Sequence, residues 1–341
     1  MIQELIEKDD NMIENKQVIE SPLDSPNLKK RNNRRAFSSI FWYLWDMKMS
    51  RIGLIIFLAY VVLAIVGPFI SPYSPTSTKF MLNSPPTISH PLGTTAYGQD
   101  VMSQILSGAA PTLLVALFVG FVATLISVLV GIVAGLSQST WIDAILNGIT
   151  YIFLLIPGIL FIILIATFFL GAGISLGYVS IILALTLTGW AWGARTLRAQ
   201  TMSIAKLDYI LSSKLIGESK LSIVFRQIIP GNFSLILSNL FFTSIYGILG
   251  LTFVEFFGLG NEAAVNWGTI LYWSISNEAY LTGEWWWYIP ISFIITGLGL
   301  SFAMMNFGMD QVSNAKLRNL VKYTRVVKAN KKNRIEMGKR E

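Results

Sequence analysis

The sequence predicts an all-α membrane fold with six transmembrane helices, and three observations support this prediction. Hydrophobic residues make up 53% of the 341 residues, which is more than one soluble core of this size needs. Six stretches of the chain are apolar and free of Asp, Glu, Lys and Arg. Each has about the 20 residues that a helix needs to cross the ~30 Å hydrocarbon layer. Finally, nearly all Lys and Arg residues lie in three segments outside these apolar stretches, at the two ends of the sequence and in one loop.

The six predicted spans are residues 52–70, 112–136, 152–170, 174–192, 233–254 and 286–308. In the second span, the small residues Gly131 and Gly135 predict a close approach of another helix. In the third, Pro157 followed by Gly158 predicts a kink. Several prolines after the first span predict an irregular external loop.

The basic residues predict the orientation. Residues 1–51 hold nine of the 26 Lys and Arg, residues 193–232 hold six, and residues 309–341 hold ten. Because cytoplasmic segments of membrane proteins carry the excess of Lys and Arg, we expect both termini and the 193–232 loop in the cytoplasm. The +7 net charge is therefore explained by the cytoplasmic location of the basic segments, and no nucleic-acid partner is expected.

The domain organisation follows from these segments. Residues 1–36 are charged and are expected to form a mobile cytoplasmic tail. The aromatic-rich residues 37–51 suit a short interfacial helix, with ordinary anchoring of the first span as the alternative. Residues 52–310 form the six-span domain, and 311–341 a basic cytoplasmic tail.

The sequence lacks the residues that several kinds of functional site require. There is no cysteine, and the single His90 has no second histidine with which to build a metal site, so it is read as structural or solvated. No phosphate loop that could bind ATP occurs. None of the six span cores has an ionisable side chain, which argues against ion-coupled transport near the midplane and places the energy source elsewhere.

The loop 196–230 between the fourth and fifth spans is the most informative segment. Its apolar residues recur at helical spacing on both sides of Gly217, which predicts two short helices, the second ended by Pro230 before the next span. Such a loop either docks on a partner or packs on its own bundle.

In this loop the sequence resembles the permease subunits of bacterial ABC importers. Their signature is a Glu-Ala-Ala stretch, a glycine four residues later and a proline thirteen residues after the glycine. Gly217 and Pro230 match this spacing, and Leu211-Ser212-Ser213 stands where Glu-Ala-Ala is usual. Because the carboxylate is missing, no salt bridge from that site to the ATPase is expected.

Three further segments resemble the oligopeptide, dipeptide and nickel branch of this family, and the similarity covers roughly residues 40–320. They are His90-Pro91-Leu92-Gly93-Thr94 with Gly98-Gln99-Asp100 and Gly108, then Glu255-Phe256-Phe257-Gly258-Leu259-Gly260 with Trp267-Gly268-Thr269, and Asp310 with Leu317-Arg318. Together these motifs are specific, although each alone is weak.

The resemblance implies a six-helix permease fold and a division of labour. The loop would couple to a cytoplasmic ATPase through Asp208, Tyr209, Ser212, Ser213, Leu215, Gly217, Phe225, Arg226 and Pro230. Asp100, Glu255 and Trp267 would lie at the external mouth, near substrate or an extracytoplasmic binding protein. The chain itself would be non-catalytic and bind no cofactor, with ATP and Mg²⁺ on two partner ATPases.

A second six-span permease would complete the path, because one bundle without polar interior groups offers little lining for a hydrophilic solute. The location implied is a bacterial cytoplasmic membrane. Peptide is the expected substrate, with nickel or a metal chelate as the alternative within the family. A secondary transporter or channel driven by an ion gradient, and a membrane scaffold without transport, are the alternatives outside it.

Overall fold

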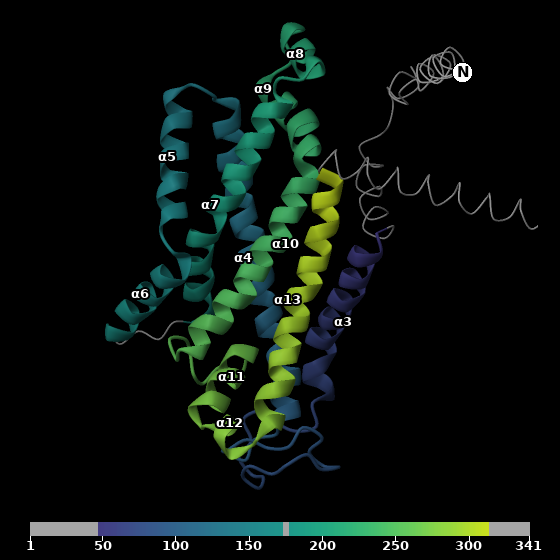
Figure 1. Ribbon diagram of the computed structural model, residues 1–341, viewed down its shortest axis with the longest axis vertical. Coiled ribbons are helices and arrows are strands. Elements are labelled where there is room, and N and C mark those ends of the chain that lie inside the picture. Colours follow the sequence, from purple (N-terminus) through teal and green to yellow (C-terminus); the bar gives the residue numbers. More distant parts are fainter. Residues whose placement is uncertain (1–46, 173–176, 314–341) are drawn as a thin grey trace, which may run out of the picture. The chain divides into compact units, whose positions relative to one another are not determined.

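The computed structural model describes residues 47–172 and 177–313 (Figure 1). The chain divides into two units, Met1–Tyr43 and Leu44–Glu341, and every described residue belongs to the second, which is described here by itself. The predicted tail at 1–36, residues 37–46 of the predicted interfacial helix and the basic tail from residue 314 onward lie outside the described residues.

Within the described residues, the regular structure is helical, which confirms the all-α prediction. The helices are α3 (Lys48–Ile70), α4 (Val101–Leu136), α5 (Trp141–Leu155), α6 (Gly158–Gly171), α7 (Tyr178–Ile204), α8 (Asp208–Leu215), α9 (Lys220–Ile223), α10 (Ile229–Phe256), α11 (Trp267–Ser276), α12 (Ala279–Thr282) and α13 (Trp285–Ser313), with a π-helical turn at Val224–Ile228 between α9 and α10.

Helix α4 lies at the centre of the packing. It contacts α7 and α10 extensively and also α3, while α13 packs between α10 and α3. A Cβ atom added at Gly131 would lie 2.7 Å from the Ala194 carbonyl oxygen of α7, and one added at Gly135 would lie 2.7 Å from Thr201 Cβ. The two glycines therefore permit the close α4–α7 approach, as the sequence predicts.

The predicted count of six spans is not confirmed. Among the described residues, α3, α4, α13 and the continuous helix Lys220–Phe256 are long and apolar enough to cross a membrane, and the bent pair α5–α6 raises the number to five if it forms one span. Helix α7, at the place of the fourth predicted span, has 27 residues. Its second half carries Arg195 and Arg198, which lowers its apolar character.

Three span boundaries differ clearly from the prediction. Helix α7 ends at Ile204, past the predicted end of the fourth span at residue 192. Helix α4 begins at Val101 rather than at residue 112, because Asp100 caps it and Pro111 is accommodated inside it. Residues 101–111 precede the predicted second span, yet they are helical and several of them are buried. The apolar stretch thus marks only part of the helix.

The third predicted span, 152–170, contains the break between two helices. Helix α5 begins already at Trp141, and α5 and α6 meet at an angle of 79° around Pro157, so the predicted kink is confirmed. The residue before the proline, Ile156, has the extended ψ of 120° that the proline ring favours. Arg198 of α7 fastens α5 by donating from Nε and Nη2 to the two carboxylate oxygens of Asp143, over 2.7 and 2.8 Å.

Candidate functional site

The loop that follows α7 forms a helix, a turn and a second helix at one end of the helical bundle, opposite α12 (Figure 1). We call the segment from Ala205 to Ile228 the α8 loop. Helix α8 ends at a turn in which Gly217 has a φ of +82°. The N–H of Gly217 donates to the Lys214 carbonyl over 3.1 Å, and that of Glu218 donates to the Ser213 carbonyl over 3.0 Å. Glycine suits this position because a left-handed residue commonly ends a helix in this pattern.

The return from the α8 loop to the bundle corrects one prediction. Pro230 was expected to end the second loop helix, but it lies at the start of α10, which continues from α9 through the π-helical turn. In that turn the N–H of Ile229 donates to the Val224 carbonyl, five residues back. The wider turn accommodates the proline, which lacks an N–H to donate, so the helix continues without a break.

A small apolar cluster anchors the α8 loop to the bundle. Ile210 of α8, Ile223 of α9 and Ile228 are buried together with Ile132 of α4 and Ile204 of α7. Ile210 is the one side chain of α8 that is fully buried. The apolar spacing found in the sequence therefore serves the loop's own bundle at these positions.

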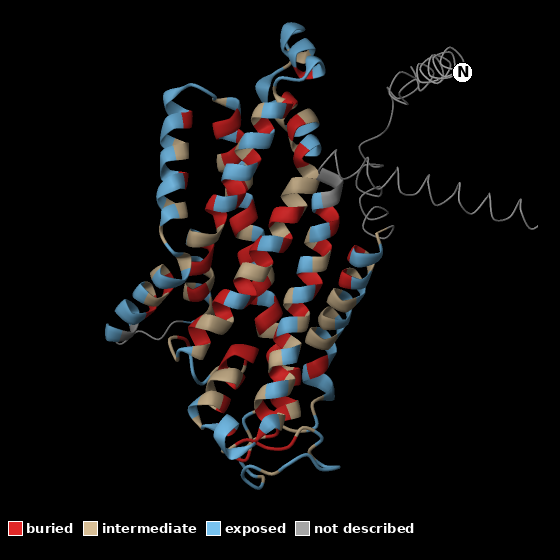
Figure 2. Cartoon of the chain, in the orientation of Figure 1, coloured by how far each residue is buried: buried red, intermediate tan, exposed pale blue. Residues whose placement is uncertain are grey.

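Most other large apolar side chains of the α8 loop are exposed. Leu215 and Ile216 are 88% and 83% exposed. Leu221, Phe225, Tyr209 and Leu211 are also exposed, and α8 is largely coloured as exposed in Figure 2. We call Leu215, Ile216, Leu221 and Phe225 the apolar tip. Large apolar side chains exposed within one short loop mark a candidate interaction site.

A polar network holds the two halves of the α8 loop together beneath the apolar tip. Gln227 Nε2 donates to Ser213 Oγ and to Glu218 Oε2, each over 2.8 Å, and Ser222 Oγ donates to Glu218 Oε1 over 2.6 Å. The hydrogen bond from Ser222 is the largest cause that lowers the pKa of Glu218 below its usual 4.5. Sequence reasoning missed Gln227 and Glu218, because their 9-residue separation follows no helical period.

The predicted coupling residues are therefore brought together, but in different roles. Tyr209, Leu215 and Phe225 are exposed, as are Asp208, Ser212, Arg226 and Pro230, whereas Ser213 belongs to the polar network and Gly217 forms the turn. Their contact with an ATPase stays a prediction. No group of three His, Cys, Asp or Glu side chains that could hold a metal ion occurs in residues 47–172 and 177–313.

The residues predicted at the external mouth gather at the opposite end, which we call the α12 end (residues 71–105 and 255–284). Asp100 is fully buried and caps α4. Its carboxylate accepts from the Ser103 N–H over 2.8 Å and from Ser103 Oγ over 2.7 Å, and it pairs with His90 Nδ1 at 2.8 Å. The expectation of a structural His90 is consistent with this hydrogen-bonded contact.

Glu255 and Trp267 meet at a second buried junction of the α12 end. Asn266 Nδ2 donates to Glu255 Oε1 over 3.1 Å, and Asn266 itself caps α11. Trp267 Nε1 donates to the Ile105 carbonyl of α4 over 2.9 Å. Glu255 is 2% exposed and Trp267 1%, so neither side chain reaches solvent. In this structure the two residues, like Asp100, fasten the α12 end, and a contact with substrate or a binding protein stays a prediction for all three.

The bundle interior is more polar than the sequence prediction assumed. Ser127 Oγ of α4 donates to the Trp190 carbonyl of α7 over 2.7 Å, and Asn239 Nδ2 of α10 donates to Thr124 Oγ1 over 3.1 Å. A pocket of about 270 Å³ between α7, α10 and α13 is lined in part by Trp192, Asn239, Asn306 and Asp310. The expectation of a bundle without polar interior groups was wrong, since it counted only charged residues.

Comparison with known proteins gives a consistent picture. Residues 127–312 match the family described as the inner membrane component of binding-protein-dependent transport systems, and residues 37–86 match the N-terminal transmembrane domain of oligopeptide transport permease C. The chain is 32% identical to the dipeptide transport system permease protein DppC of Bacillus subtilis, over 80% of this chain and 83% of that protein.

A second relative and one solved structure are also similar to this chain. The chain is 29% identical to the oligopeptide transport system permease protein OppC of Bacillus subtilis, over 80% of this chain and 87% of the relative. A chain in the inward-facing structure of the MetNI methionine ABC transporter matches with a TM-score of 0.50 and 19% identity, over 62% of this chain and 95% of the other. That likeness concerns the fold alone.

Proposed function

Because this chain belongs to the family of inner membrane components of binding-protein-dependent transport systems, and is thus a multi-pass permease subunit of an ABC importer, we propose that it forms half of a peptide path and couples that path to a cytoplasmic ATPase. The relatives whose names specify dipeptide and oligopeptide transport support peptide as the substrate. ATP and Mg²⁺ would bind to two ATPase partners, and this chain would bind no cofactor.

The observation that carries the coupling proposal is the apolar tip on its polar network. Leu215 and Ile216 expose nearly their whole side chains to solvent, which is unfavourable unless a partner covers them. The bonds from Gln227 to Ser213 and Glu218 fix the segments that carry the tip. A tip that is fixed to α10 in this way can transmit a displacement of the ATPase to the helices that line the path.

The path would lie where this chain meets a second permease. Asn306 and Asp310 of α13 and Asn239 of α10 line the pocket between α7, α10 and α13. These amide and carboxylate groups suit a hydrophilic solute. The excess of Lys and Arg in residues 193–232 supports a cytoplasmic α8 end, and hence an external α12 end that receives an extracytoplasmic binding protein in a bacterial cytoplasmic membrane.

Affinity purification from gently solubilised native membranes tests this proposal, with mass spectrometry of the proteins recovered and an ATPase assay. We expect a second permease and phosphate-loop ATPases to co-purify with the natural chain. The variant Leu215→Asp places a charge on the apolar tip and should lose the ATPases. Leu281→Asp, at a 67% exposed leucine of the α12 end, is the matched control and should retain them.

Reconstituted vesicles containing the recovered complex then test the activity through ATP-dependent uptake of a labelled tripeptide. Recovery of a homogeneous homo-oligomer that transports solute without ATP would replace the proposal by a gradient-driven transporter or channel. Equal recovery of the ATPases with Leu215→Asp would show that the apolar tip is not needed for ATPase docking.

A further inference from the structure

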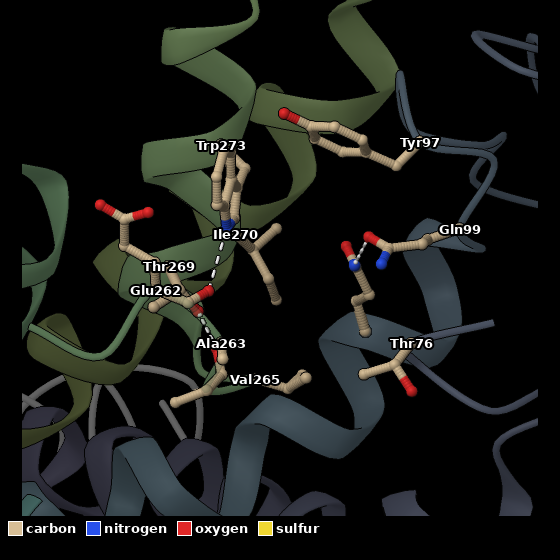
Figure 3. A pocket seen from close by; sticks show the side chains of 11 residues that line it. Thr76, Tyr97, Gln99, Glu262, Ala263, Val265, Thr269, Ile270 and Trp273 are labelled. Carbon is tan, nitrogen blue, oxygen red and sulfur yellow. Dashed lines mark hydrogen bonds between the residues drawn. The ribbon is translucent and has the colours of Figure 1, made fainter. Parts of the chain in front are cut away.

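A pocket of about 360 Å³ opens at the α12 end, between the start of α4, the segment before it, and α11 (Figure 3). Ile270 and Val265 form apolar parts of its wall. The rings of Tyr97 and Trp273 meet edge to face in the same pocket, with their centroids 5.4 Å apart. The volume falls within the range of about 300–1,000 Å³ that is typical of small-ligand sites. Nothing in the proposed coupling uses this pocket.

A pair of carboxamides lies in the wall of this pocket. Gln104 Nε2 donates to Gln99 Oε1 over 2.7 Å, the bond drawn beside Gln99 in Figure 3. Gln104 is 8% exposed, and its Oε1 accepts no hydrogen bond from any described residue. A buried acceptor without a donor is unfavourable and is normally satisfied by water or a ligand. Gln104 is among the residues that line the pocket, so a ligand bound there can supply the missing donor.

The free groups of the amide pair define the complementary ligand. Two carboxamides joined by one hydrogen bond retain an acceptor on one amide, Gln104 Oε1, and N–H donors on the other, Gln99 Nε2. Among the described residues no hydrogen bond from Gln99 Nε2 is formed. The N–H and C=O of one residue in an extended peptide point to the same side and so offer the matching donor and acceptor.

The one charged side chain of the lining lies away from the amide pair. Glu262 is the one acidic residue of the lining, but its Oε1 accepts from the Tyr272 hydroxyl over 3.2 Å. In Figure 3 its carboxylate lies on the other side of Trp273 from Gln99 and Tyr97. The groups that face the amide pair are neutral, which suits an uncharged polar ligand.

We infer that this pocket binds a peptide group, with hydrogen bonds to Gln99 and Gln104 and an adjacent apolar side chain against Ile270 and Trp273. The inference rests on the proposed function and adds a recognition site at the external end of the path. The peptide group belongs either to the incoming substrate or to a loop of the extracytoplasmic binding protein, and the two sources share the same chemistry.

The absence of cysteine permits a direct test by thiol protection. Thr76 lies on the exposed rim of the pocket, so Thr76→Cys places a single thiol there. The full-length chain, purified with its partners and reconstituted in nanodiscs, is treated with a water-soluble maleimide with and without acetylated, amidated tri-alanine. The tripeptide should slow the labelling of the cysteine at position 76. Thr78→Cys, an exposed position outside the lining, is the matched control and should label at the same rate under both conditions.

Second substitutions in the Thr76→Cys background connect the protection to the amide pair. Gln104→Leu should abolish protection, while Gln138→Leu, the same change at an exposed turn near the α8 end, should preserve it. Ala263→Trp fills the pocket from an exposed rim position without removing a buried contact, and should also abolish protection. This variant keeps the test decisive if Gln104→Leu fails to fold.

Further measurements distinguish a substrate peptide from a loop of the binding protein, and an uncharged ligand from a cation. Protection by the co-purified binding protein without added tripeptide, and none by the tripeptide, assigns the peptide group to that protein. Equal protection by methylammonium overturns the assignment of an uncharged ligand, and protection by neither tripeptide nor binding protein overturns the site. Peptide uptake is measured in parallel. Uptake without protection contradicts peptide binding in this pocket but leaves the proposed function intact. Protection in a chain that recovers no ATPases and shows no uptake contradicts the proposed function but leaves peptide binding intact.

Discussion

At the α12 end, Asp100, Glu255 and Trp267 are buried and form hydrogen bonds that connect separate segments, whereas at the α8 end Leu215 and Ile216 are exposed without a covering segment among the described residues. Apolar side chains are exposed at both ends, since Ile88 and Leu281 are also exposed at the α12 end. The difference lies in the buried hydrogen bonds: those of Asp100, Glu255 and Trp267 connect segments of the α12 end, whereas, within the described part of the chain, Leu215 and Ile216 are held only through the backbone of the α8 loop. The α12 end is therefore stabilised by its own chain, and the proposed function gives the apolar tip a partner.

The largest effect is expected from Trp267→Ala at the α12 end. This side chain is 1% exposed and its Nε1 donates to the Ile105 carbonyl of α4, so its removal should lower the free energy of unfolding by about 3–5 kcal/mol. Trp285→Ala, at a 51% exposed tryptophan, is the matched control and should change it by less than about 1 kcal/mol. Denaturation in mixed micelles measures both. Equal losses would contradict the contrast between buried and exposed side chains.

A smaller effect is expected when Asp100 is replaced by Ala. The substitution removes the cap of α4 and leaves His90 without its carboxylate, which should cost about 2 kcal/mol. His90→Gln alone should cost less, because the bonds from Ser103 to Asp100 remain. A double-mutant cycle measured by the same denaturation gives the coupling of the pair. A coupling of zero would show that the two residues stabilise the α12 end independently.

At the α8 end, Gly217→Val should cost about 1–2 kcal/mol locally, because a β-branched residue is strained at a φ of +82°. A Cβ added at Gly217 meets no atom within 4 Å, so the strain comes from the backbone rather than from a clash. We expect hydrogen exchange to accelerate in the α8 loop while α4 stays protected, and ATP hydrolysis to lose its coupling to uptake. Gly148→Val, in a helix where an added Cβ also meets nothing, is the control. Normal uptake by Gly217→Val would contradict a role of this turn in coupling ATP hydrolysis to uptake.

The smallest effect concerns pH and the polar network of the α8 loop. The pKa of Glu218 is lowered in the folded chain, chiefly by the Ser222 hydroxyl. A carboxyl group whose pKa falls on folding contributes stability above its unfolded value, and this contribution is lost as the pH falls through the folded value. Exchange protection of the α8 loop should therefore decline below about pH 4.5.

Glu218→Gln should remove this dependence, and Glu262→Gln, at a carboxylate of the α12 end, should leave it unchanged. Persistence of the decline in Glu218→Gln would assign it to another group.

The sequence determined the parts of this protein that depend on local pattern. Apolar stretches predicted helices at the membrane-spanning segments, Pro157 predicted the break between α5 and α6, and Gly217 predicted the turn after α8. These features follow from helix periodicity and from the backbone preferences of Pro and Gly, which act within a few residues. The family resemblance followed from the same local spacings.

Only the tertiary structure decided which side chains of a motif lie inside and which outside. Gln227 finds Glu218 and Ser213 because a turn reverses the chain between them, and Trp267 finds Ile105 from 162 residues away. Burial of polar groups requires partners that the chain brings together from distant segments, and no local pattern specifies them. For this reason the sequence predicts Asp100 and Glu255 only at the external mouth, whereas the folded chain buries both carboxylates among hydrogen-bond partners.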